Sequence, residues 1–190
     1  MKHRLSTWSK CAVVFSAFVA LGAVEARADV KLEETYSTYQ LRGLSREAIH
    51  EDLHRVAKRD RDGLIDGEMS NDLHWNFRFA AAENSCRVSS DEIVLKIYIL
   101  LPRWVDEERA NSVLHSIWNT YFQELKAHED GHKTIAVAAA ERISKLAHDA
   151  TASGSCTALE RSLNDAAKRI VEDSERAQNQ HDLNSQPFDL

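Results

Sequence analysis

Several features that mark other protein classes are missing from this chain of 190 residues. It has no long apolar stretch beyond one near its N-terminus, no glycine-rich phosphate loop, no internal repeat and no linker. It also lacks the basic patch that a nucleic-acid binder needs. We therefore expect one domain of ordinary size that binds no nucleic acid.

The single apolar stretch has the layout of a secretory signal peptide. Basic residues occupy three of the first ten positions, residues 11–24 are mostly small and apolar, and Ala26-Arg27-Ala28 has the form that signal peptidase accepts. The apolar run is shorter than the roughly 20 residues that span a bilayer, which argues against a membrane anchor. The sequence predicts cleavage after Ala28, a signal peptide over residues 1–28, and no stable membrane span in the mature chain.

The mature chain, residues 29–190, has a composition that suits an extracytoplasmic protein. Its 162 residues hold 20 Lys and Arg against 29 Asp and Glu, a net charge of −9. Of three cysteines, Cys86 and Cys156 remain after cleavage. An even pair in an oxidising compartment predicts one disulfide rather than two buried thiols. We expect a periplasmic or secreted protein.

Hydrophobic periodicity predicts strands first and long helices afterwards. Between residues 106 and 148 the chain has no proline and only Gly131, which favours one long helix. We expect strands over residues 36–41, 73–79 and 88–101 and helices over residues 45–57, 106–148 and 157–178. Pro102 is expected to end the last strand. The fold prediction is α+β, a small antiparallel sheet followed by two long helices.

The long helix carries the motif His128-Glu129-Asp130-Gly131-His132, which is typical of zincin-like active-site helices. Residues i and i+4 lie on one helical face, so His128 and His132 can occupy two corners of a tetrahedral zinc site. Glu129 would lie near the open corner, where it can take a proton from metal-bound water. This pattern predicts a Zn²⁺ site and a hydrolase that cleaves a peptide or protein substrate.

A second stretch, His50-Glu51-Asp52-Leu53-His54, has the same pattern. It lies in a short helix crowded with charged residues, which is typical of a solvated surface. The later motif sits inside a long helix directly after the sheet, with apolar residues from Ile135 onward to pack beneath it. We therefore assign the metal to His128 and His132 and none to His50 and His54.

The order of several short motifs resembles a bacterial family called domain of unknown function 922, a family of predicted secreted zinc-dependent proteases. The motifs that carry the resemblance are Tyr39 to Ser45, Trp75-Asn76-Phe77-Arg78-Phe79, Cys86-Arg87-Val88, Leu101-Pro102-x-Trp104, His128-Glu-x-Gly-His132 and Cys156. The resemblance covers most of the mature chain. It implies a secreted domain of metallopeptidase type.

The tail departs from the family, which ends in a Tyr-Asp-x-x-Thr-x-His-Gly-like segment. Here Asp182 is retained and Ser185 replaces Thr, but Pro187 occupies the late His position. A catalytic zinc needs a third protein ligand, for which Asp182 is our provisional choice. The alternatives are His181, Glu172 and Glu175. The changed tail also motivates a second hypothesis, a non-catalytic envelope protein with a degenerate or structural metal site.

Overall fold

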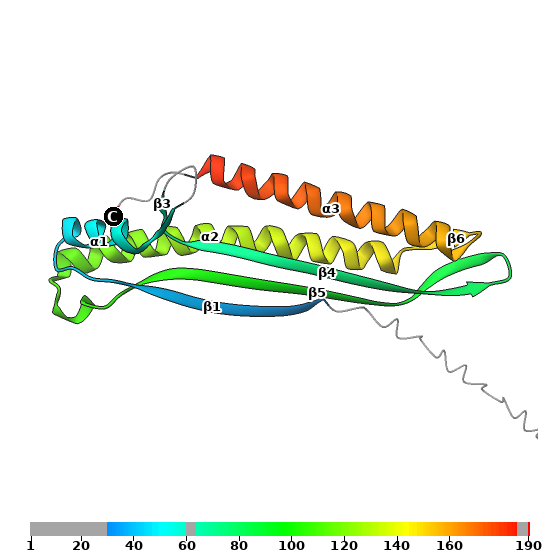
Figure 1. Ribbon diagram of the computed structural model, residues 1–190, viewed down its shortest axis with the longest axis horizontal. Helices are drawn as coiled ribbons and strands as arrows, with labels where there is room; N and C mark the ends of the chain where they lie inside the picture. Colours follow the sequence, from blue (N-terminus) through cyan, green and yellow to red (C-terminus); the bar gives the residue numbers. More distant parts are fainter. Residues whose placement is uncertain (1–29, 60–63, 186–189) are drawn as a thin grey trace, which may run out of the picture.

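A long sheet forms one layer of the molecule, and two long helices cover one of its faces (Figure 1). The computed structural model describes residues 30–59, 64–185 and 190. The predicted signal peptide, residues 1–28, therefore lies outside the described residues. The helices are α2 (Ser112–His148) and α3 (Cys156–Asn184).

The sheet is mixed and larger than expected. Its strands are β1 (Lys31–Leu41), β4 (Glu68–Ala82), β5 (Ser85–Trp104) and β6 (Thr151–Ser153). The order is β1-β5-β4, and β6 pairs with the first residues of β5. The β4–β5 hairpin inserts β5 between β4 and β1, so that β5 runs parallel to β1. The prediction of a small antiparallel sheet is wrong in this respect, and the α+β class is confirmed.

Pro102 does not end the last strand, which continues to Trp104. The reason lies in the pairing at this end of the sheet. β4 begins at Glu68, opposite Leu100, so Pro102 has a neighbour only in Tyr39 of β1. A proline is tolerated at such an edge because the missing N–H has no ladder partner to lose.

The helix starts follow local capping. Helix α1 (Arg46–Val56) begins as predicted, with the Ser45 side chain accepting a hydrogen bond from the Ala48 backbone N–H. Helix α2 begins later than predicted, because Asn111 and not Asp106 is its N-cap. Asp106 instead accepts a hydrogen bond of 3.0 Å from the Gly43 backbone N–H, ahead of a short 3-10 helix (Glu107–Arg109).

The three-to-four spacing predicts a buried face of α2 formed by Val113, Ile117, Tyr121, Leu125, His128, His132 and Ile135. The observed face is rotated slightly from it. Val113 was expected to be buried and is 68% exposed, whereas Leu114 is 4% exposed. From Tyr121 onward the prediction and the structure agree at Leu125 and His132. The buried face also includes Glu129, which places a carboxyl group between the helix and the sheet.

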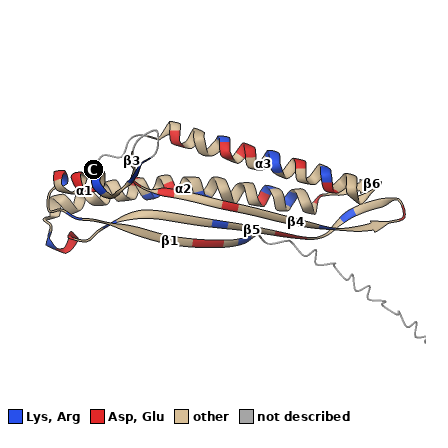
Figure 2. Cartoon of the chain, in the orientation of Figure 1, with Lys and Arg blue, Asp and Glu red and all other residues tan. Residues whose placement is uncertain are grey.

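Helix α3 runs antiparallel to α2 and ends six residues later than residue 178, where we predicted its end (Figure 1). Acidic and basic residues alternate along it (Figure 2), and Arg142 on α2 meets Asp173 on α3 at 3.2 Å. Small buried residues such as Ala140 and Ala167 lie between the long elements. The extra turns of α3 bring its C-terminal end alongside the histidine motif of α2.

The predicted disulfide is present. Cys86 at the start of β5 is bonded to Cys156 at the start of α3, across 70 residues of sequence. Disulfides are typical of proteins outside the reducing cytosol. None of the helices in the described part of the chain combines the length and apolar character that a bilayer crossing requires.

Removing this disulfide with Cys86→Ser and Cys156→Ser is expected to lower the free energy of unfolding by about 2–4 kcal/mol, because the open chain regains loop entropy. Urea denaturation of the wild type, the variant and the reduced wild type measures the effect. An equal midpoint in all three would contradict it.

Candidate metal centre

Helix α2 presents two imidazoles on one face. The ring centroids of His128 and His132 lie 4.6 Å apart, and their Nε2 atoms lie 3.0 Å apart. This is the arrangement expected of residues at i and i+4. The two Nε2 atoms are close enough to bind one metal ion together.

Helix α3 adds a third imidazole. The ring of His181 stacks on that of His128, with centroids 4.7 Å apart. One potential ligand atom from each of His128, His132 and His181 lies within 4.8 Å of the other two. Among the described residues, these three histidines form a group compact enough to hold a metal ion.

Hydrogen bonds determine which nitrogen of each ring is available. The Ser185 hydroxyl donates to the His181 carbonyl, so its oxygen accepts from His128 Nδ1–H at 2.8 Å. The Gln178 amide oxygen accepts from His132 Nδ1–H, and the Gln178 amide nitrogen donates to the His132 carbonyl at 3.1 Å. Both Nε2 lone pairs therefore face the site.

The third ring is oriented in the same way. His181 Nε2–H donates to the His128 carbonyl oxygen at 3.1 Å, which leaves the lone pair on Nδ1. Each of the three imidazoles thus donates one N–H to a protein acceptor and keeps the other nitrogen as a potential ligand. Gln178 was not predicted from the sequence, although it lies one helical turn before His181.

Gly131 makes room for His181. A Cβ atom at position 131 would lie 2.6 Å from His181 Cε1, closer than real Cβ contacts. The glycine inside the motif is therefore a condition for the approach of the third ring.

Asp182, the provisional third ligand, also reaches the site. Its Oδ1 lies 2.8 Å from His132 Nε2 and 3.3 Å from His128 Nε2. These spacings resemble the edge of about 3.3 Å of a tetrahedron with zinc–nitrogen bonds of about 2.0 Å. The Asp182 side chain is 55% exposed, whereas those of the two histidines are 14% and 11% exposed. The carboxylate therefore lies on the solvent side of the two histidines.

The two glutamate alternatives lie away from this group. Glu172 and Glu175 are exposed and precede His181 by nine and six residues on the same helix. At the rise of an α-helix this places them about 14 Å and about 9 Å along the axis. Neither belongs to the compact group.

Glu129 is buried beside the histidines. Its side chain is 3% exposed, and burial raises its pKa to about 7, although the Met69 backbone N–H donates a hydrogen bond to it. Its Oε1 also lies 2.9 Å from the position that a Cβ of Gly67 would occupy. Met69 at the start of β4 thus fixes the carboxyl group by a hydrogen bond, and Gly67, just before the strand, lies against it.

Burial also affects His128. Desolvation, together with the neighbouring His132 and His181, lowers the pKa of His128 below its usual value. A lower pKa favours the neutral imidazole, which is the form that binds a metal ion. The environment thus favours the protonation state that a ligand needs.

The raised pKa of Glu129 predicts a pH-dependent cost in the metal-free protein. An unfolded glutamate loses its proton near pH 4.5, but the folded one retains it until about pH 7. Stability is therefore full below pH 4.5 and falls as the pH rises through 7, by about 3 kcal/mol. Metal-free Glu129→Gln should be more stable than the wild type at pH 8, with the gap closing at pH 4. Urea denaturation at both pH values measures the difference in free energy of unfolding between the two proteins. A difference that does not change with pH would contradict the raised pKa of Glu129.

A cavity of about 430 Å³ opens beside His128 and Glu129. It is bounded by α1, by β3 (Leu64–Ile65) and by the turn at Asp66 and Gly67. The scattered acidic residues of positions 60–66 predict a solvated turn. Residues 60–63 lie outside the described residues, and Asp66 is half-buried, with its carboxylate accepting from the Tyr121 hydroxyl at 3.2 Å.

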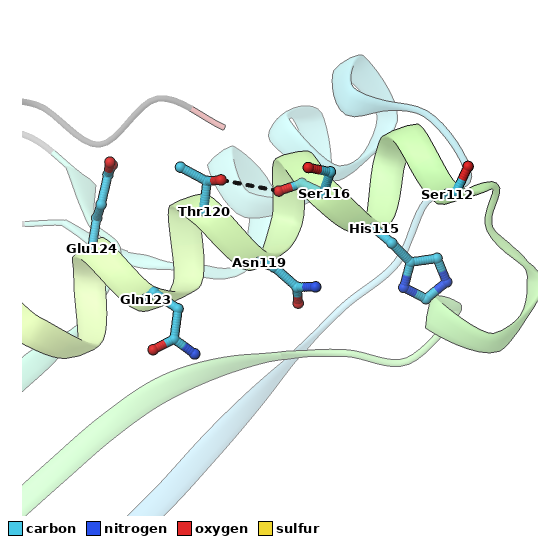
Figure 3. Close-up of a pocket in the computed structure, with 7 residues that line it drawn as sticks. All are labelled: Ser112, His115, Ser116, Asn119, Thr120, Gln123 and Glu124. Atoms are coloured by element: carbon cyan, nitrogen blue, oxygen red, sulfur yellow. Dashed lines mark hydrogen bonds between the residues drawn. The ribbon is translucent and has the colours of Figure 1, made fainter.

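A larger hollow of about 780 Å³ lies elsewhere, on the N-terminal half of α2. Figure 3 shows its lining side chains spread along several turns of one helix, with a single dashed hydrogen bond from Thr120 to the Ser116 carbonyl. The side chains do not converge on a point. The hollow is therefore surface relief and not a second candidate site.

The chain was compared with family models, curated proteins and solved structures. The model of the family described as "Bacterial protein of unknown function (DUF922)" matches residues 36–188. No curated protein and no solved structure matched the chain.

Proposed function

The chain belongs to the DUF922 family, whose function is unknown, and from the chemistry of its site we propose that it is a zinc-dependent metallopeptidase. Three imidazoles with potential ligand atoms within 4.8 Å of one another suit zinc, which prefers nitrogen ligands in tetrahedral geometry. When bound, the zinc would supply a water of lowered pKa and a Lewis acid for the substrate carbonyl.

Glu129 supports the catalytic assignment most strongly. A buried carboxyl group with a pKa of about 7 is costly to the fold, and it stands on the wall of a cavity beside three potential ligands. A general base works best with a pKa near the working pH. Glu129 would accept a proton from the attacking water and deliver it to the amine that leaves.

Histidine and aspartate compete for the third ligand position. We favour His181 on α3, because its ring is fixed against α2 by a hydrogen bond to the His128 carbonyl and by stacking on the His128 ring. Its Nδ1 lone pair is then available. Asp182 would then be an exposed carboxylate that moves aside for water. His181→Ala should lose zinc, and Asp182→Ala should retain most of it. The reverse result would make Asp182 the third ligand.

The Asp182 carboxylate also supports a second candidate function. If His128, His132, His181 and Asp182 all bind the ion, four protein ligands leave no open position, and the site is structural. The protein would then be a non-catalytic envelope protein stabilised by a metal. The short distances from Asp182 to His132 and His128 are the observation that favours it.

The test is cleavage of a proteome-derived peptide mixture, followed by mass spectrometry. The metallopeptidase proposal expects new termini with the zinc-loaded protein, loss of cleavage after chelation, and recovery with added zinc. Intact peptides in every sample, together with a large loss of thermal stability on chelation, would favour the structural role.

A site of action outside the cytoplasm is part of the proposal. The Cys86–Cys156 disulfide is typical of an oxidising compartment, and the predicted signal peptide over residues 1–28 directs export. The substrate would be a peptide or protein in the periplasm or outside the cell.

A further inference from the structure

Helix α1 carries the other copy of the motif, and its histidines line the cavity that borders the candidate metal centre. His50 and His54 line the same cavity as His128 and Glu129. Their ring centroids lie 4.5 Å apart, so the two imidazoles form a pair on one wall. Both residues are exposed and accessible to a ligand.

This pair is not a second metal site. It belongs to no compact group of three ligands among the described residues. The carboxyl group that faces it, Asp66, already accepts a hydrogen bond from Tyr121. Burial raises the pKa of Asp66, whereas the charges of His50 and His54 lower it. Both histidines therefore lie near that carboxyl group.

The contacts of His54 with Arg59 leave one N–H group of its ring available to donate a hydrogen bond into the cavity. Arg59 Nη2 lies 3.5 Å from His54 Nδ1 and donates to the His54 carbonyl at 3.0 Å. A guanidinium group only donates, so Nδ1 accepts and the ring proton lies on Nε2. That N–H can donate to the oxygen of a ligand.

The rest of the cavity offers apolar surface. Leu53 and Leu190 are 2% and 5% exposed, and Leu64 and Ile65 are half-buried. The cavity therefore combines aliphatic walls, two exposed imidazoles on one side, and the candidate metal centre on the other. Sites for small ligands commonly pair apolar walls with a few polar groups that orient the ligand.

We propose that this cavity is the substrate cleft, in which His50 and His54 donate hydrogen bonds to peptide carbonyl oxygens and the aliphatic walls receive a leucine-sized side chain. The inference rests on the proposed function, because it names the substrate class of the same site. His50 and His54 are substrate-binding residues here, not ligands.

The test measures the dissociation constant of the peptide acetyl-Ala-Leu-Leu-Ala-amide by calorimetry, with zinc content determined on the same samples. Glu129→Gln is the parent, so that the peptide stays intact. His50→Ala with His54→Ala should raise the dissociation constant at least about tenfold, the effect of losing one to two hydrogen bonds. Zinc content should not change. Replacing His54→Ala by His54→Gln in the double variant, which returns a hydrogen-bond donor, should restore part of the lost peptide affinity.

The matched control is His74→Ala, an exposed histidine on β4 whose ring contacts Asp72 and does not line the cleft. It should bind the peptide as the parent does. Equal affinity in the double variant and the parent, or no binding to the parent, would overturn the inference. If no sample contains zinc, the metallopeptidase proposal fails. The comparison of peptide affinity with and without His50 and His54 still shows whether the cavity binds the peptide.

Discussion

Glu129→Gln is expected to reduce peptide hydrolysis by about 10²–10⁴-fold and to leave the bound metal in place. The amide has nearly the same shape as the carboxyl group but cannot accept the proton of the attacking water. The potential ligands His128, His132 and His181 are untouched by the change. Initial rates on a peptide that the wild type cleaves, with zinc content measured in parallel, provide the test.

The matched control for this variant is Asp130→Asn, the same chemical change one residue away. Asp130 pairs with Lys126 at 2.5 Å, outside the compact histidine group. The Asp130→Asn variant should hydrolyse the peptide at a rate within a few-fold of the wild type. Unchanged hydrolysis in Glu129→Gln would remove Glu129 from the mechanism, whatever its pKa.

Gly131→Ala is expected to weaken zinc binding by about a hundredfold or more. The added Cβ would overlap the His181 ring, which must move away from His128 and His132. Loss of a supporting contact alone costs 10–100-fold in metal affinity, and displacement of a ligand should cost at least the upper figure. Alanine is the better helix former by about 1 kcal/mol, so α2 itself should not be weakened.

Gly67→Ala provides the matched comparison, since its Cβ would meet Glu129 and Leu125 and no histidine. We expect this variant to keep its zinc and to lose hydrolysis, because the general base is displaced and the ligands are not. Competition with a fluorescent zinc chelator gives the dissociation constants. Wild-type zinc affinity in Gly131→Ala would show that His181 is not a ligand.

Local chemistry made part of this structure predictable from the sequence. The Ser45 cap, the long helix with His128 and His132 on one face, and the Cys86–Cys156 disulfide are all present. Each depends on residues that are close in sequence or, for the disulfide, on there being a single possible pairing in the mature chain. The burial of Glu129 could not be predicted in this way, because it depends on the sheet beneath α2.

Features that depend on contacts between distant segments were predicted less well. The parallel pairing of β1 with β5 follows from the insertion of a hairpin strand, which no local pattern encodes. The end of α3 was placed too early because the polar residues after 178 lack an apolar stripe. Their contacts to α2 are instead hydrogen bonds: His181 donates to the His128 carbonyl oxygen, and the Ser185 hydroxyl accepts from the His128 ring. Polar contacts with α2 thus replace apolar packing at the end of the helix.

The most direct test of the metal centre is the zinc content of the purified protein, measured beside His132→Ala and His54→Ala. The two variants remove the second histidine of the two copies of one motif, so each controls for the other. We predict one zinc ion per chain in the wild type and in His54→Ala, and none in His132→Ala. A wild-type protein without zinc after supplementation, or zinc that is retained in His132→Ala and lost in His54→Ala, would contradict the proposed site.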